Sequence, residues 1–166
     1  MKWFHDPKRV YTKADYTEED LLQYGLDHLN AAKKLFDLSG RQQWDYIISA
    51  TYLSHLGVEL LLKACHLHLF KSFKGTHDLK ELFRPLEKQG IKLSKENKEW
   101  LNKGLKHAVE ARYPDQGLGP DIGTEQWNKT ASLIEELKNA LPREIQKQLA
   151  FLERYRSNVR SGRVLT

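Results

Sequence analysis

The segment from about Gln43 to Lys71 constrains the fold of this chain most, because it is apolar on almost every side of a helix. A helix that is hydrophobic nearly all round must be covered by other elements. We therefore expect a buried central helix that ends in the segment 71–75. Its apolar residues include Ile47, Ile48, Leu53, Leu56, Val58, Leu60, Leu61, Leu62, Leu67 and Leu69.

Capping signals predict further helices on both sides of the central one. Thr17 with Asp20, and Asp78 with Glu81, have the spacing of capping boxes, which satisfy the first backbone N–H groups of a helix. Gly40, Gly90 and Pro114 are typical stop signals. The helices that we expect span about 17–38, 43–71, 78–90, 95–113, 124–140 and the segment from 142 onward.

Five or six helices with short connections, and no sustained β alternation, predict an all-α protein. The chain has 166 residues, which suits one domain with a real hydrophobic core. We expect an irregular N-terminal arm over 1–16, a single helical bundle domain over 17–156 and a basic C-terminal tail over 157–166.

Cysteine use and hydropathy favour a cytoplasmic protein without a membrane span. Cys65 is the single cysteine, so no disulfide can form within the chain, and its apolar setting predicts a buried, inert thiol. The first eight residues lack the apolar stretch of a signal peptide. His, Glu and Lys interrupt the longest apolar run, so no transmembrane helix is expected.

The formal net charge of +5 is concentrated near the C-terminal end of the sequence. A basic segment can contact phosphates, or it can be a solvated terminus without such a role. Both interpretations stay open from the sequence. The basic residues after residue 142 are Arg143, Lys147, Arg154, Arg156, Arg160 and Arg163, against Glu144 and Glu153.

A polar stripe on the central helix is the sharpest functional signal. At 100° per residue its members fall within about 120° of one another. Glu59 and Lys63 are four residues apart in the favourable order for an ion pair. The stripe is either an internal ion pair with neighbouring histidines, or one wall of a ligand groove or dimer interface. Its members are Thr51, Tyr52, His55, Glu59, Lys63 and His66.

Motifs for the common catalytic and cofactor chemistries are missing from the sequence. There is no HExxH or Cys/His pair with zinc-ligand spacing, no GxSxG nucleophile elbow and no P-loop. We therefore predict no catalytic residue, no metal site and no cofactor.

Three short motifs resemble the HEPN family. Gly57–Ala64 reads GVELLLKA and is similar to the family's central helix, while Thr76–Leu79 reads THDL and is similar to the opening of its next helix. Ala111–Asp115 reads ARYPD, similar to the end of the following helix. The resemblance covers about residues 44–116.

The resemblance implies an antiparallel four-helix-bundle core with one or two additional helices, often in a homodimer. Family members are metal-independent ribonucleases, or non-catalytic proteins that bind nucleotides or partner with nucleotidyltransferases. The ribonucleases carry an Arg followed four to six residues later by His. No arginine here has a histidine at that spacing, since Arg112 is followed by YPDQGLG. The resemblance therefore implies a non-catalytic member, in a defence or toxin–antitoxin setting.

The matched motifs supply the candidate site. A cation, an imidazole and an aromatic ring could bracket a phosphate and stack a base, although internal pairing and helix capping explain the same residues. Two rivals are a divergent ribonuclease that uses Arg112 with His107 or His77, and a purely structural dimerisation module. The ligand or phosphate-binding candidates are Glu59, Lys63, His77, Asp78, Arg112 and Tyr113, with Tyr52, His55 and His66 as secondary candidates.

Overall fold

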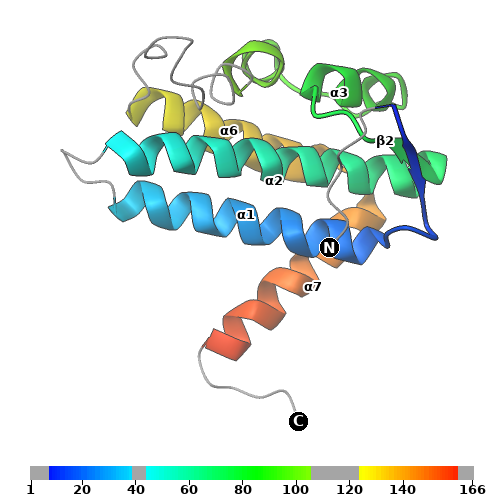
Figure 1. The fold of residues 1–166 in the computed structure, drawn as a ribbon, viewed down its shortest axis with the longest axis horizontal. Helices are drawn as coiled ribbons and strands as arrows, with labels where there is room; N and C mark the ends of the chain where they lie inside the picture. The colour runs from blue at the N-terminus through cyan, green and yellow to red at the C-terminus, as the bar shows by residue number, and fades with distance from the viewer. Residues whose placement is uncertain (1–7, 39–43, 106–123, 161–166) are drawn as a thin grey trace.

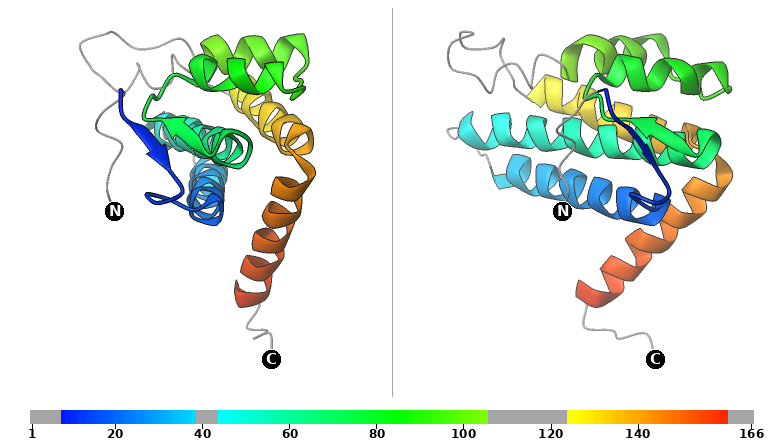
Figure 2. Two further views of the ribbon diagram at one scale, coloured as in Figure 1. Left: turned by 90° about the vertical axis from the view of Figure 1, so that its right-hand side faces the viewer. Right: turned by 45° about the vertical axis from the view of Figure 1, so that its right-hand side comes forward.

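Two long antiparallel helices, α1 (Glu18–Leu38) and α2 (Trp44–Phe70), lie side by side at the centre of the fold (Figure 1). The structure is a computed structural model, and it describes residues 8–38, 44–105 and 124–160. Helix α6 (Thr124–Ala140) runs along α2, and α3 (Leu79–Lys88) and α4 (Lys95–Glu99) lie across α2 and α6 (Figure 2). The predicted all-α architecture is confirmed.

Helix α4 changes its winding part of the way along. It continues into a π-helical turn, η2 (Trp100–Gly104), and then into Leu105. This α4–η2 helix packs on α6 and α3. Helix α7 (Arg143–Arg160) crosses α1 and projects beyond the bundle (Figure 2).

One predicted capping box forms in full, and the other forms only its N-cap half, because the Asp78 backbone N–H donates to the Thr76 hydroxyl and not to Glu81. The Thr17 hydroxyl accepts from the Asp20 backbone N–H at 3.0 Å, and the Asp20 carboxylate accepts from the Thr17 N–H at 3.0 Å. Asp78 caps α3 by accepting from the backbone N–H of Glu81 at 3.0 Å. These local signals fix where α1 and α3 begin.

A two-stranded antiparallel sheet was not predicted. β1 (Val10–Thr12) pairs with β2 (Ser72–Lys74), so the expected irregular arm contains a strand that ties it to the end of α2. Tyr11 and Phe73 face each other in register, and their rings stack with centroids 5.3 Å apart. Three residues are too few for a strand to show its alternation in the sequence.

Helix α7 extends to Arg160, four residues into the expected C-terminal tail. Arg156 docks it on α1, because its guanidinium contacts the Asp27 carboxylate at 2.9 Å and donates to the Gln23 carbonyl at 2.7 Å. One arginine of the basic segment is thus used in tertiary packing.

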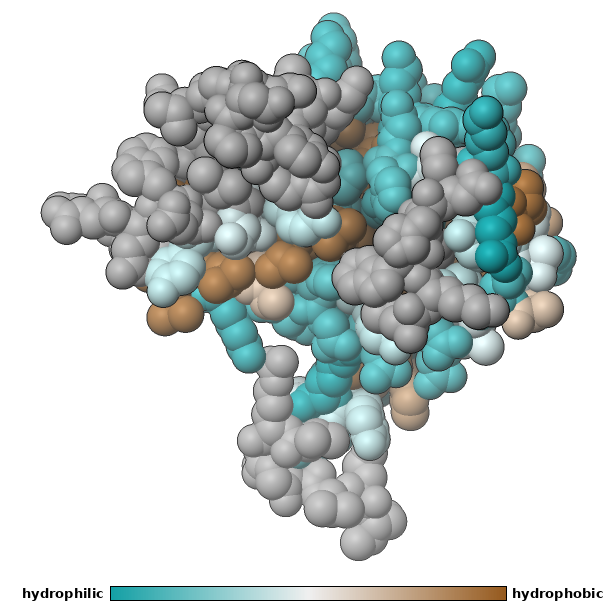
Figure 3. Space-filling model, viewed as in Figure 1, coloured by the Kyte–Doolittle hydropathy of each residue, from teal (hydrophilic) through white to brown (hydrophobic). Residues whose placement is uncertain are grey.

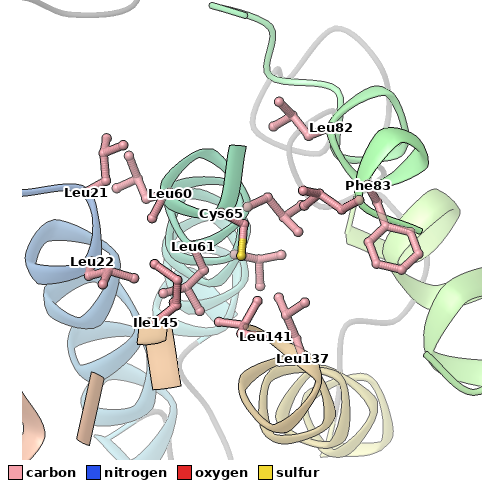
Figure 4. Close-up of a cluster of buried hydrophobic side chains, with 14 of the residues drawn as sticks. Leu21, Leu22, Leu60, Leu61, Cys65, Leu82, Phe83, Leu137, Leu141 and Ile145 are labelled. Atoms are coloured by element: carbon pink, nitrogen blue, oxygen red, sulfur yellow. The ribbon is translucent and has the colours of Figure 1, made fainter. Parts of the chain in front are cut away.

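The hydrophobic core lies where α1, α2, α3, α6 and α7 converge (Figure 4). Leu61 and Cys65 of α2 are fully buried at its centre. Cys65 is buried as predicted, and burial raises the pKa of its thiol to about 12. Within the described ranges, no helix has the length and apolar character needed to cross a bilayer.

Two glycines allow α1 and α2 to approach closely. A Cβ on Gly25 would lie 3.3 Å from the Gly57 carbonyl oxygen, and a Cβ on Gly57 would lie 3.0 Å from that of Gly25. The Gly57 Cβ would also lie 2.5 Å from the Leu29 side chain. The backbones of the two helices therefore approach most closely where these two glycines face each other.

Replacing Gly57 with alanine should destabilise the protein. The clash with Leu29 is a case of overpacking, which costs about 1–3 kcal/mol, whereas alanine gains about 1 kcal/mol in helix propensity. We expect a net loss of up to about 2 kcal/mol in the free energy of unfolding, measured by urea denaturation. Adding Leu29→Ala to Gly57→Ala should cost less than the two single changes combined. A stabilised Gly57→Ala variant would contradict the close approach.

Candidate functional site

Glu59 and Lys63 form an ion pair inside the bundle. The Lys63 Nζ donates to Glu59 Oε1 at 2.6 Å, and the two side chains are 0% and 2% exposed. The surrounding stripe faces inward as well, since Thr51, His55 and His66 are all buried. The first of the two interpretations of the stripe, an internal ion pair with neighbouring histidines, describes this geometry.

His77 connects the buried pair to the surface. It lies between β2 and α3, next to the capping residue Asp78, and its Nδ1 lies 3.0 and 3.1 Å from the two Glu59 carboxylate oxygens. Its side chain is 53% exposed. Because a carboxylate only accepts, the Nδ1 atom must carry the proton in this contact. Glu59 thereby fixes the orientation of an imidazole that solvent can reach.

His55 contacts two backbone carbonyls from inside the bundle, next to Glu59. Its Nε2 lies 3.1 Å from the His77 carbonyl, and its Nδ1 lies 3.3 Å from the Leu105 carbonyl. A neutral ring has one N–H and donates to one of these carbonyls at a time, while the charged ring donates to both. His55 therefore joins α2 to the His77 loop and to the end of the α4–η2 helix.

The π-helical turn places Leu105 at that position. Trp100 folds back over Gly104, where a Cβ would lie 2.2 Å from the indole ring. The Trp100 Nε1 donates to the Thr130 hydroxyl on α6 at 3.1 Å. Single π turns in α-helices are often found at functional sites.

The charges of the cluster compensate one another. Burial opposes ionisation of Glu59, but the His77 hydrogen bond and the Lys63 charge outweigh it and lower the pKa of this carboxyl. Burial lowers the pKa of Lys63, and Glu59 opposes that change. With a contact of 2.6 Å between them, we assign the pair as carboxylate and ammonium. Burial also lowers the pKa of His55, although Glu59 lies 3.8 Å from its ring.

His28 on α1 belongs to this electrostatic cluster and was missed in the sequence. Burial lowers its pKa, while the charges of Asp27 and Glu59 raise it. The polar stripe was predicted from the spacing of residues along α2. That spacing does not indicate which residues of α1 lie nearby. Gly25, which precedes His28 by three residues on α1, lies close to Gly57 of α2 and so brings the two helices together.

The other candidates lie beside the Glu59–Lys63 pair on α2 or lie outside the described residues. His66, one helical turn beyond Lys63, lies 2.7 Å from the Leu82 carbonyl through its Nε2. Tyr52 is half-buried on α2. Arg112, Tyr113 and His107 lie outside the residues that the structure describes.

The site has buried residues that hold it in place and exposed residues that a ligand can contact. Glu59 and Lys63 are too deeply buried to touch a ligand, whereas His77 and Asp78 are exposed. We call the exposed surface at these two residues the His77 face. Among the described residues, His, Cys, Asp and Glu nowhere gather in a group of three that would hold a metal ion.

A comparison with known families agrees with this arrangement of helices. A family model described as "HEPN domain" matches residues 18–128. The match begins with α1 and reaches into α6, so it includes the whole Glu59 cluster. No curated protein and no solved structure gives a significant match to the chain.

Proposed function

Because the chain belongs to the HEPN family, we propose that it is a non-catalytic HEPN domain that binds a nucleotide or RNA through the His77 face. Membership in the family supports a role related to nucleotides or RNA. The lack of an Arg–His pair at the ribonuclease spacing supports binding without cleavage.

The observation that carries the proposal is the support of His77 by Glu59. An imidazole whose Nδ1 is held by a buried carboxylate keeps one orientation, so little side-chain entropy is lost when it meets a phosphate. Asp78 holds the adjacent start of α3 in place. Arg112 and Tyr113, from the ARYPD motif, are proposed to complete the face with a cation and an aromatic ring.

Nucleotide binding predicts a rise in the melting temperature that depends on His77. A ligand at about 100 times its Kd stabilises the folded state by about 2.7 kcal/mol. We expect at least one member of a panel of nucleoside mono-, di- and triphosphates, or a short single-stranded RNA, to raise the Tm of the protein. The His77→Ala variant should lose most of that shift.

The matched control is His68→Ala, which removes a histidine of α2 that contacts Glu18 of α1. It should keep the shift. Stabilisation by no nucleotide and no RNA would refute the proposal and favour a purely structural interaction module. An equal loss in both variants would show that His77 has no specific part in binding.

A divergent ribonuclease is the second candidate, and the Glu59–His77 contact favours it. A carboxylate that holds Nδ1 is the arrangement that orients a histidine for proton transfer. Incubation of the purified protein with total RNA decides between the two. Cleavage that is lost in Arg112→Ala and His77→Ala would establish the ribonuclease, and intact RNA would exclude it.

We also propose that the domain acts as a homodimer, with a nucleotidyltransferase as its protein partner in a defence or toxin–antitoxin system. Family membership is the support for this part of the proposal. Light scattering coupled to size-exclusion chromatography should give twice the mass of the 19.4 kDa chain. A monomer at micromolar concentration would contradict the homodimer.

A further inference from the structure

A groove between α3, β2 and the end of α2 lies next to the Glu59 cluster, since the Lys63 ammonium is 5.7 Å from the ring centroid of Phe73 in the groove lining. Its volume is about 710 Å³, within the range of about 300–1,000 Å³ that is usual for small-molecule sites. It is lined by residues of β1 and β2, by His66 and Phe70 of α2, and by the first turns of α3. We call it the α3–β2 groove.

Apolar side chains from three elements form part of the groove lining. Val10 of β1 and Phe70 of α2 are 55% and 37% exposed, and Pro85 of α3 is also part of the lining. The Phe70 ring lies 5.1 Å from the His66 ring, centroid to centroid. Exposed aromatic and aliphatic side chains of this kind favour the binding of a ligand with a flat, apolar ring.

Cations on α3 give the groove its charge. Lys80 and Arg84 both line it and are four residues apart, so they share one side of the helix. Within the described part of the chain, neither forms an ion pair. The third cation, Lys74, is paired with Glu81 at 2.7 Å, and Asp78 is used as the helix cap. In Figure 3 the visible surface over α3 is mainly hydrophilic.

His66 adds a hydrogen-bonding group to the lining. It is 9% exposed, and its Nε2 lies 2.7 Å from the Leu82 carbonyl, so Nε2 carries a proton. Burial lowers the pKa of His66 and favours the neutral ring. The Nδ1 atom of that ring is then an acceptor, which suits a ligand with an N–H or O–H group near its flat part.

We propose that the α3–β2 groove binds a small planar aromatic anion, with its ring against Phe70 and Val10 and its anionic group on Lys80 and Arg84. This inference goes beyond the proposed function, because only Asp78 belongs to both the groove and the His77 face. A nucleoside phosphate and an aromatic carboxylate share this chemistry.

The test is a fluorescence titration with 8-anilinonaphthalene-1-sulfonate, an aromatic anion with a planar naphthalene ring that reports apolar surface. Saturable binding at one site is expected. Lys80→Ala/Arg84→Ala should weaken it roughly tenfold, and Phe70→Ala roughly fivefold. The charge-matched control Lys88→Ala/Lys92→Ala, which removes two exposed cations outside the groove, should change it little.

Two competitors then identify the anionic group. Displacement of the probe by AMP assigns a phosphate, and displacement by indole-3-acetate assigns a carboxylate. The proposal is overturned if the probe does not saturate, if the control double variant loses as much affinity, or if neither competitor displaces it. If His77→Ala weakens binding of the probe and Lys80→Ala/Arg84→Ala does not, the probe binds at the His77 face. That result would also overturn the groove site.

Discussion

Lys63→Met should destabilise the protein by about 3–5 kcal/mol, because it leaves the Glu59 carboxylate buried without its cation. Methionine keeps most of the length of the lysine side chain, so the loss reports the missing charge more than a cavity. Urea denaturation of wild type and variant measures the difference in the free energy of unfolding.

Two variants separate the ion pair from side-chain volume. Lys33→Met breaks the i,i+4 ion pair between Lys33 and Asp37. The nitrogen–oxygen distance in that pair is 2.8 Å, similar to that of the buried pair, but both side chains are more than half exposed. It should leave stability nearly unchanged. Glu59→Gln/Lys63→Met removes both charges and should recover more than half of the loss. A Lys63→Met variant as stable as wild type would show that Glu59 does not depend on Lys63.

Acidification should destabilise the protein well above the pH at which exposed carboxylates titrate. Burial lowers the pKa values of His28, His55 and His66. Between each lowered pKa and the unfolded value near 6.5, the unfolded chain binds more protons, so stability falls as the pH falls. Each histidine contributes up to about 1.4 kcal/mol per pH unit in that window.

The Glu59 carboxyl adds a second phase at lower pH. Its pKa is lowered in the folded protein, so its contribution is present above the unfolded value of 4.5 and is lost as the pH falls through the folded value. We expect stability to fall between about pH 7 and pH 5.5 as the unfolded histidines take up protons, and to fall further at lower pH as Glu59 takes up its proton.

Urea denaturation across this range measures both phases. His66→Gln, which removes one of the three buried rings, should make the first phase shallower without shifting the second. If stability is constant or increases as the pH falls from neutral to about 5.5, the first phase does not come from the three buried histidines.

The helical part of the fold was predictable because its signals are local. Caps such as Thr17 and Asp78 act on backbone groups three residues away, and apolar spacing acts within one or two turns. The Glu59–Lys63 pair was predictable for the same reason, since both residues are on one helix at i,i+4. The sequence did not decide between an internal pair and a groove wall.

The missed features depend on contacts between distant segments. His55 meets the Leu105 carbonyl 50 residues away, and β1 pairs with β2 across the whole of α1 and α2. His28 of α1 feels the charge of Glu59 of α2, and no spacing along either helix indicates that. The α3–β2 groove combines residues of four elements, and no spacing along the chain indicates it.

The most direct test of the central claim, that the His77 face binds a nucleotide or RNA, is an NMR titration of the ¹⁵N-labelled protein. The ligand is the nucleotide or RNA that stabilises it most. The account predicts saturating amide shifts centred on Thr76, His77 and Asp78, with smaller shifts at His55. The result that would contradict it is an unchanged spectrum, or shifts centred on α7 or on Lys80 and Arg84 while the amide of His77 stays in place.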